Sequence, residues 1–324
     1  MKTDLIDLLV CPDCESPLRC ESDSTIDGEI LNGQLRCNNG HGFPISRGIP
    51  RFVDADAYAD SFSKQRLYVR RHFRHYEHDR SGDARFTPST GIPLSDLNQG
   101  VSLEIGCGYG RYLDVVQRHG GQIVGVDLST HSVELAYDFV GRQPGVHIVQ
   151  CDLFKMPFRR QSFANVFSLG VLHHTPDTEQ AFKAIVPYAA ADGRVAIWVY
   201  HPDRKRVADR WRRYTTRFPH SALYSWCIVN QAAFSWIRAL PGGHRFSRLI
   251  PGAAPKRGGS NFWQRVMSDF DSLSPEYAHS HREDEVKRWF REAGLDDVEV
   301  LDFPTAVCGV QPATERTRDA EVPA

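Results

Sequence analysis

A glycine-rich loop between two apolar runs holds the residues whose types and spacing could do chemistry in this 324-residue sequence. The first run covers 101–105, the second covers 122–126 and ends at Asp127, and the loop between them contains Gly106, Gly108 and Gly110. This pattern predicts a buried strand, a sharp turn beneath a ligand, a helix and a second strand. Asp127 lies 21 residues beyond Gly106, where an acidic side chain suits two vicinal ribose hydroxyls. We therefore expect a nucleoside-containing cofactor on a doubly wound sheet.

Glu104 indicates the charge of that cofactor. Dinucleotide folds usually space their glycines G-x-G-x-x-G, so that the following helix holds a pyrophosphate at its N-terminus. Here the motif is E-x-G-x-G-x-G, with Glu104 two residues before the first glycine. A carboxylate at this place repels a pyrophosphate and attracts an ammonium or sulfonium group. The loop therefore favours a cationic nucleoside ligand.

The order of four segments resembles the class I S-adenosylmethionine-dependent methyltransferases, of the type 11-like kind. The segments are 101–110, 151–158, 163–177 and 193–200. The resemblance implies an α/β fold with a doubly wound, Rossmann-like sheet that is mostly parallel. It also implies an antiparallel edge hairpin at the C-terminus, which we expect from the strand patterns at 297–303 and 305–310. An amphipathic helix over 283–294 would precede this hairpin.

The same resemblance implies S-adenosylmethionine as the cofactor and assigns residues to it. Glu104 and the loop after Gly106 would hold the methionine part, Asp127 the ribose, and Asp152 with Leu153 the adenine edge. The complete implied set is Glu104, Gly106, Gly108, Gly110, Asp127, Leu128, Asp152, Leu153 and Leu169.

Three histidines are candidates for removing a proton from the methyl acceptor. His173 and His174 follow the expected fourth strand, at the end of the sheet where ligands bind in such folds. Histidine titrates in the useful pH range, although in the family such a pair often shapes the pocket without acting as a base. His281, before the C-terminal helix, is the third candidate. Its alternative role is a helix-entry residue that faces solvent.

Cysteines near the N-terminus predict a metal site. Cys11 and Cys14 form one short turn motif, and Cys37 with His41 forms a second. Two such turns are the layout of a small tetrahedral zinc site. Cys20 is a rival fourth ligand, but it lies in an alternating strand-like run close to Cys14. We expect Cys11, Cys14, Cys37 and His41 to bind Zn²⁺, and the alternative is that the cysteines merely pack in a small core.

This N-terminal segment is similar to the zinc module of certain ribosomal-RNA guanine methyltransferases. It is also similar to the small zinc subunit that activates several methyltransferases. Four protein ligands leave no open position on the metal, so the zinc would be structural. A unit of about 50 residues is marginally stable without such a staple.

The expected organisation has four parts and one insertion. These are a zinc module at 1–54, a helical connector at 55–99 that would cover the cofactor, a methyltransferase domain at 100–312 with a helical insertion at about 201–270, and a disordered tail at 313–324. In the connector, Tyr58, Phe62 and Gln65 are candidates to line the cofactor pocket, and the preferred alternative is that they serve ordinary helix packing. Within the insertion, 201–265 holds 13 Lys and Arg against two Asp, around a nearly uncharged helical stretch. That stretch is a buried lid, a surface for a membrane interface, or a surface for RNA.

Composition and charge limit the classes of function. A net charge of −1 gives no chain-wide field for nucleic acid, the first residues do not form a signal peptide, and scattered cysteines favour a reducing compartment. We expect a cytoplasmic protein, with peripheral membrane contact through 201–265 as an alternative. The favoured activity is O-methylation of a small-molecule or lipid-linked acceptor, such as a sugar, a polyprenyl-derived compound or a secondary metabolite. The alternatives are an RNA base methyltransferase and a non-catalytic activator of a partner enzyme.

Overall fold

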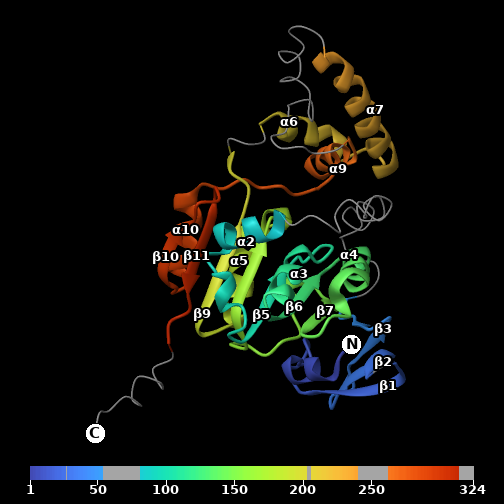
Figure 1. Cartoon of the computed structure of the whole chain (residues 1–324), viewed down its shortest axis with the longest axis vertical. Helices are drawn as coiled ribbons and strands as arrows, with labels where there is room; N and C mark the ends of the chain where they lie inside the picture. The colour runs from blue at the N-terminus through green and yellow to red at the C-terminus, as the bar shows by residue number, and fades with distance from the viewer. Residues whose placement is uncertain (27, 54–80, 203–205, 240–261, 314–324) are drawn as a thin grey trace.

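The computed structural model describes residues 1–26, 28–53, 81–202, 206–239 and 262–313. Within them, an N-terminal module lies against one edge of a large sheet, and a group of helices lies beyond the sheet (Figure 1). Tyr58, Phe62 and Gln65, which the sequence made candidates for the pocket, fall outside the described residues, as does the tail from 314 onward.

The large sheet has seven strands in the order β10-β11-β9-β8-β5-β6-β7. Its strands are β5 (Val101–Ile105), β6 (Gln122–Asp127), β7 (Val146–Gln150), β8 (Phe163–Leu169), β9 (Ala189–Trp198), β10 (Asp296–Val300) and β11 (Ala306–Val310). Strands β5 to β9 pair in parallel, whereas β11 is antiparallel to both β9 and β10. The predicted doubly wound sheet with an antiparallel edge hairpin is confirmed.

Helices cover both faces of this sheet, because neighbouring residues of each parallel strand point to opposite faces and both faces are buried. On β6, Ile123 faces the side of α2 (Ser81–Thr90), α3 (Arg111–Arg118) and α4 (Thr130–Ala136). The next residue, Val124, faces the side of α5 (Thr178–Ile185) and α10 (Glu283–Glu292). Several helices begin at a side-chain cap: Asp177, for example, accepts a hydrogen bond from the amide of Gln180 at 3.0 Å and opens α5.

The N-terminal module consists of a short 3₁₀ helix and an antiparallel sheet of four strands in sequential order. Its elements are η1 (Thr3–Leu8), β1 (Leu18–Ile26), β2 (Glu29–Cys37), β3 (Gly42–Ser46) and β4 (Ile49–Pro50). A small sheet of this kind can bury only one face on its own. Its apolar side chains therefore need a second surface.

That second surface is the large sheet, where the module takes the place of a crossover helix. The connection from β7 to β8 contains only the 3₁₀ turn η5 (Leu153–Lys155) and no α-helix. The module covers the part of the sheet face that such a helix would otherwise cover. Its Leu5 and Leu9 belong to the same buried cluster as Val124 and Val149. Backbone hydrogen bonds continue across the junction: the amide of Val10 donates to the carbonyl of Pro157 at 2.9 Å, and that of Phe52 to Gln150 at 2.8 Å.

The helical layer beyond the sheet is formed by α6 (Arg206–Thr215), α7 (His220–Ala239) and α9 (Phe262–Leu273). Helix α9 contacts the other two, and Leu223, Cys227 and Phe270 form part of a separate small core between them. These helices include the described parts of the expected insertion (Figure 1). None of the helices in the described ranges combines the length and apolar character needed to cross a bilayer.

A buried histidine at the module junction leads to a pH prediction. His147 on β7 lies 3.6 Å from the Asp4 carboxylate, and burial lowers its pKa to about 4 in spite of that carboxylate. The pKa in the unfolded chain is about 6.5, so the unfolded chain binds more protons as the pH falls below that value. The contribution of the neutral ring to the free energy of unfolding is therefore full above about pH 6.5. It decreases as the pH falls from about 6.5 to about 4. At about 1.4 kcal/mol per pKa unit, this loss is of the order of 3 kcal/mol.

We expect His147→Gln to lose less stability than the wild type between pH 7 and 4.5, measured by urea unfolding at each pH. His119→Gln is the matched control, since His119 is exposed at the end of α3. Equal losses in the wild type and His147→Gln would contradict the assignment.

Candidate functional site

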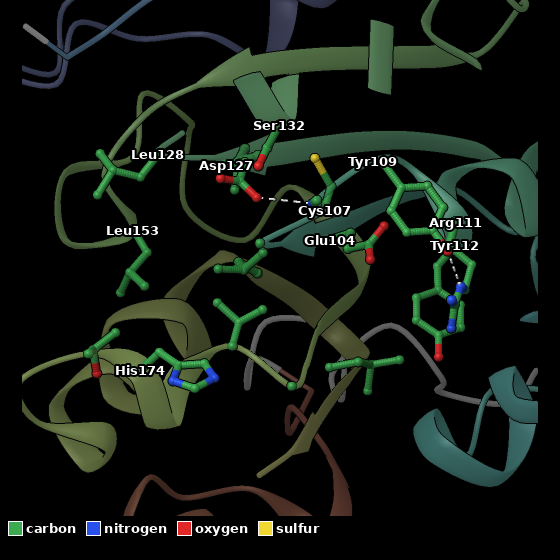
Figure 2. A pocket seen from close by; sticks show the side chains of 18 of the residues that line it. Glu104, Cys107, Tyr109, Arg111, Tyr112, Asp127, Leu128, Ser132, Leu153 and His174 are labelled. Carbon is green, nitrogen blue, oxygen red and sulfur yellow. Dashed lines mark hydrogen bonds between the residues drawn. The ribbon is translucent and has the colours of Figure 1, made fainter. Parts of the chain in front are cut away.

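A cavity of about 370 Å³ opens at the carboxyl ends of β5, β6 and β8, which is the place where doubly wound sheets bind ligands. Its size falls in the range of small-molecule sites. Of the predicted cofactor residues, all except Gly110 line it: Glu104, Gly106, Gly108, Asp127, Leu128, Asp152, Leu153 and Leu169. Figure 2 shows Leu128 and Leu153 on one side of the cavity, Tyr109 and Tyr112 on the other, and Glu104 between them.

The glycines shape the floor of the cavity in two ways. Gly106 has φ +75°, and a Cβ atom there would lie 2.4 Å from a methyl group of Val171, so a larger residue would both strain the turn and collide. Gly110, with φ +91°, precedes α3 and packs against Val140 and Ala136 of the α4 region. Gly110 therefore supports the loop from outside the lining of the cavity, and its role in binding the cofactor stays a prediction.

Asp127 is oriented by the backbone around it. One carboxylate oxygen accepts from the amide of Gly108 at 3.0 Å and the other from the amide of Ser129 at 2.9 Å (Figure 2 shows the first). These two bonds join the end of β6 to the glycine loop, so the carboxylate has a fixed direction at the cavity wall. A fixed carboxylate at the end of the second strand suits a pair of ribose hydroxyls.

Glu104 supplies a buried acceptor. Its side chain is 3 % exposed, and its Oε2 has no hydrogen-bond partner among the residues that the structure describes. Burial, and then the nearby Asp127, raise the pKa of Glu104 well above its usual value. An acceptor atom left without a partner in a buried position is costly. A cationic group in the cavity would satisfy this atom, and the methionine ammonium of S-adenosylmethionine has the chemistry to do so.

The segment after β7 forms the wall expected to contact adenine. Asp152 accepts from the amide of Phe154 at 3.0 Å and caps the turn η5, which holds Leu153 beside the cavity. The same turn contacts the N-terminal module, because Lys155 forms an ion pair with Asp13. The turn that forms this wall of the cavity therefore also contacts the N-terminal module.

The structure separates the three candidate histidines. His174 lines the cavity, and its Nδ1 lies 2.8 Å from the carbonyl oxygen of Tyr277. A carbonyl can only accept, so Nδ1 carries the proton and Nε2 is the basic atom of the neutral ring. His173 does not line the cavity: it is fully buried, with its ring centroid 3.6 Å from that of Tyr200. The structure thus places His173 in the packing beside the cavity, and its role in proton transfer stays a prediction.

His281 also lies outside the lining of the cavity. Its Nδ1 is 3.0 Å from the Glu285 carboxylate, and its Nε2 is 3.0 Å from the Thr178 hydroxyl. The ring thus joins the start of α10 to the start of α5. The side chain is largely buried, so the solvent-facing alternative does not describe it. Its role in proton transfer stays a prediction.

Several lining residues were missed from the sequence. Tyr109 and Arg111 belong to the glycine loop itself, where the Arg111 Nε donates to the Tyr109 hydroxyl at 2.6 Å. Their places directly before and after Gly110 could have indicated them. Tyr200 follows the fifth strand and could have been inferred from that place. Asp271 on α9 also lines the cavity and contributes to raising the pKa of Tyr200, after burial as the larger cause. No motif marks Asp271, because it reaches the cavity only through the packing of the helical layer.

The four predicted metal ligands come together in the module. Their ligand atoms all lie within 4.8 Å of one another. The Sγ atoms of Cys14 and Cys37 are 3.8 Å apart, and a tetrahedron with Zn–S bonds of about 2.3 Å has sulfur atoms about 3.8 Å apart. The Nδ1 of His41 lies 3.3 Å from the Cys11 sulfur and 3.4 Å from the Cys37 sulfur. The rival Cys20 pairs with Leu35 on the strand ladder and is outside this cluster. The arrangement is compatible with a tetrahedral zinc site.

Comparison with known proteins finds similarity to methyltransferases in the central part of the chain. A sequence family described as a methyltransferase domain matches residues 103–197. The "Probable tRNA methyltransferase 9B" of Mus musculus is 31% identical over 148 residues, covering 44% of this chain and 31% of that protein. The "Phosphoethanolamine N-methyltransferase 2" of Caenorhabditis elegans is 27% identical over 118 residues, covering 36% of this chain and 27% of that protein. The chain thus spans about a third of the length of these curated relatives.

Among solved structures, human N-acetylserotonin methyltransferase in complex with SAM has a TM-score of 0.46 and 13% identity, covering 81% of this chain and 61% of that one. The family match covers strands β5 to β9 and the glycine loop, and the sheet order with its antiparallel β11 extends beyond it. Residues 103–197 therefore match a methyltransferase domain, and they lie within a mostly parallel sheet with the antiparallel edge hairpin that the resemblance to the class I methyltransferases implied.

Proposed function

We propose that this protein transfers the methyl group of S-adenosylmethionine to a hydroxyl of a small-molecule or lipid-linked acceptor. The observation that carries the proposal is the cavity wall itself: an oriented Asp127 stands beside a buried Glu104 oxygen that lacks a partner in the described chain. This pair matches a ligand with both ribose hydroxyls and a positive charge. The bound cofactor would supply an activated methyl group together with its own leaving group.

The work left to the protein is alignment, exclusion of water and removal of one proton. Glu104 would hold the ammonium group, Asp127 the ribose hydroxyls, and Asp152 with Leu153 the adenine. The rest of the lining includes Trp198, Tyr200 and His174, together with Asp271 from helix α9 of the helical layer, and we propose that these residues form the acceptor end of the cavity. This end combines aromatic surface with two groups that can accept a proton, which suits an acceptor with an apolar body and a reacting hydroxyl.

His174 is the proposed proton acceptor, because its basic Nε2 belongs to a ring whose Nδ1 is held by a backbone carbonyl. We expect His174→Gln to lower kcat by about 10²- to 10⁴-fold, the usual contribution of general base catalysis, with S-adenosylmethionine affinity unchanged. His279→Gln is the matched control, since the His279 amide donates to the carbonyl of His173 at 2.9 Å but His279 does not line the cavity. If Asp271→Asn abolishes turnover while His174→Gln does not, Asp271 is the proton acceptor instead.

The cofactor and the acceptor class are tested separately. Calorimetry should detect binding of S-adenosylmethionine, and binding of NAD in its place would contradict the proposal. Mass spectrometry of ligands that co-purify with the protein would identify the acceptor class.

A second candidate is an RNA base methyltransferase. It is favoured by the partial similarity to proteins described as "Probable tRNA methyltransferase 9B" and by the basic residues of 201–265. Filter binding with transfer RNA distinguishes the two candidates. Binding to a phosphate backbone weakens steeply between about 50 and 200 mM salt, whereas binding of an uncharged metabolite does not.

The metal cluster has a structural role in this proposal. Zinc held by Cys11, Cys14, Cys37 and His41 would have no open position for a substrate. Its contribution would be to hold the module against the sheet face that lacks a crossover helix.

A further inference from the structure

Helix α6 and the turn after it expose a row of large aromatic side chains. Trp211, Tyr214 and Phe218 are separated by three and four residues, which places Trp211 and Tyr214 on one face of the helix and lets Phe218 continue that row. They are 39%, 65% and 57% exposed. Single exposed apolar residues are ordinary, whereas a contiguous row of them marks a surface that meets something apolar.

A second row, of arginines, runs beside the aromatic row. Arg210, Arg213 and Arg217 repeat the same spacing one position earlier and are all exposed. None of the three forms an ion pair with another described residue. The neighbouring Arg212 behaves differently: it is buried and donates to the carbonyl oxygen of Ser272 at 3.1 Å. The exposed arginines are therefore not used to hold the helical layer together.

Helix α7 extends this surface with uncharged residues. Trp226 stacks against Trp211 with ring centroids 6.0 Å apart, and Val229, one turn further along α7, is 66% exposed. From His220 to Ala233 the helix contains no Lys, Arg, Asp or Glu. The surface thus has an aromatic and apolar centre with positive charge along one side.

We infer that this surface of α6 and α7 binds an anionic lipid bilayer, lying in the plane of its interface. Tryptophan and tyrosine are favoured at the boundary between headgroups and acyl chains, and arginines beside them are attracted to anionic headgroups. A surface that follows a nucleic-acid backbone carries cations along its length, and the first 14 residues of α7 have no Lys or Arg. The composition therefore favours lipid over RNA.

The surface is connected to the cavity. Helix α9 packs against both α6 and α7, and its Asp271 lines the cavity. Docking through α6 and α7 would therefore bring the acceptor end of the cavity close to the bilayer. This last step rests on the proposed function and selects the lipid-linked acceptors from its two classes, whereas the binding of lipid does not depend on it.

Vesicle sedimentation tests the inference directly. The full chain is mixed with vesicles of phosphatidylcholine alone or with 30% phosphatidylglycerol, and we expect binding that requires the anionic lipid. Arg213→Glu should weaken binding at least about fivefold, from roughly 1 kcal/mol per cation near an anionic surface. Tyr214→Ser combined with Phe218→Ser should weaken it at least about tenfold. Matched controls on the N-terminal module, Arg19→Glu and Ile26→Ser, replace equally exposed residues and should bind as the wild type does.

The outcomes separate this inference from the proposed function. Vesicle binding that the α6 variants lose, with unchanged S-adenosylmethionine affinity by calorimetry, supports the lipid surface. Equal binding to both vesicle types, equal loss in the control variants, or no vesicle binding together with salt-sensitive binding of transfer RNA would each overturn it. A protein that binds anionic vesicles but not S-adenosylmethionine would retain the lipid surface and contradict the proposed function.

Discussion

Replacing Cys37 with serine is expected to reduce the zinc content from one ion per chain to none and to lower the thermal unfolding temperature by about 10 °C or more. The metal would join two turns of a module whose buried apolar side chains pack partly against the large sheet. Because the module shares a buried cluster with β6 and β7, its loosening exposes the face of the large sheet as well. The destabilisation should therefore reach the methyltransferase domain and not stop at the module.

Elemental analysis and calorimetric unfolding measure this effect. Cys20→Ser is the matched control, since Cys20 lies in the same module but outside the cluster, and it should retain both zinc and stability. A Cys37→Ser protein with a full complement of zinc would contradict the assignment. If Cys20→Ser empties the site and His41→Ala does not, Cys20 is the fourth ligand.

Asp127→Ala is expected to weaken binding of S-adenosylmethionine by about 1.5–3 kcal/mol, or roughly 10- to 150-fold, as for lost hydrogen bonds to a charged group. Two effects would contribute: the ribose loses its acceptor, and the glycine loop loses the bond from Gly108 that ties it to β6. The loss should appear in the dissociation constant measured by calorimetry. Thermal unfolding of the free protein reports the contribution of the loop on its own.

Asp96→Ala is the matched control for this measurement, because Asp96 lies on the short turn η3 (Leu94–Asp96) away from the cavity. It should bind the cofactor as the wild type does. Unchanged affinity in Asp127→Ala would remove the ribose assignment, while leaving Glu104 as an independent test of the positively charged end of the ligand.

The local part of this site was predictable from the sequence. The strand, glycine loop and acidic residue around Asp127 are close together in the chain, and their spacing alone decides their geometry. The zinc ligands are similar, because each pair of ligands lies within one short turn and a tetrahedral ion requires the two turns to meet. The mostly parallel, doubly wound sheet followed from the resemblance, and its antiparallel edge hairpin was confirmed.

The histidines show what local sequence patterns leave undecided. His173 and His174 are adjacent and chemically identical, yet one is fully buried beneath Tyr200 and the other lines the cavity. The backbone turn after β8 decides which ring faces the ligand, and adjacent residues in such a turn have no period from which to infer direction. His281 was a candidate by residue type, but its partners come from α5 and α10, which no local pattern connects.

By itself, the sequence determined the α/β fold, the cofactor loop and the four residues of the metal cluster, because each depends on short-range spacing or on the period of apolar residues. Tertiary structure alone decided that Asp271 reaches the cavity and that α6 keeps an aromatic face exposed. It also decided that the module covers the sheet face that the connection from β7 to β8 leaves without a helix. These features depend on which surfaces pack together over long sequence distances. Such packing is set by the burial of all the apolar faces at once, and no single segment encodes it.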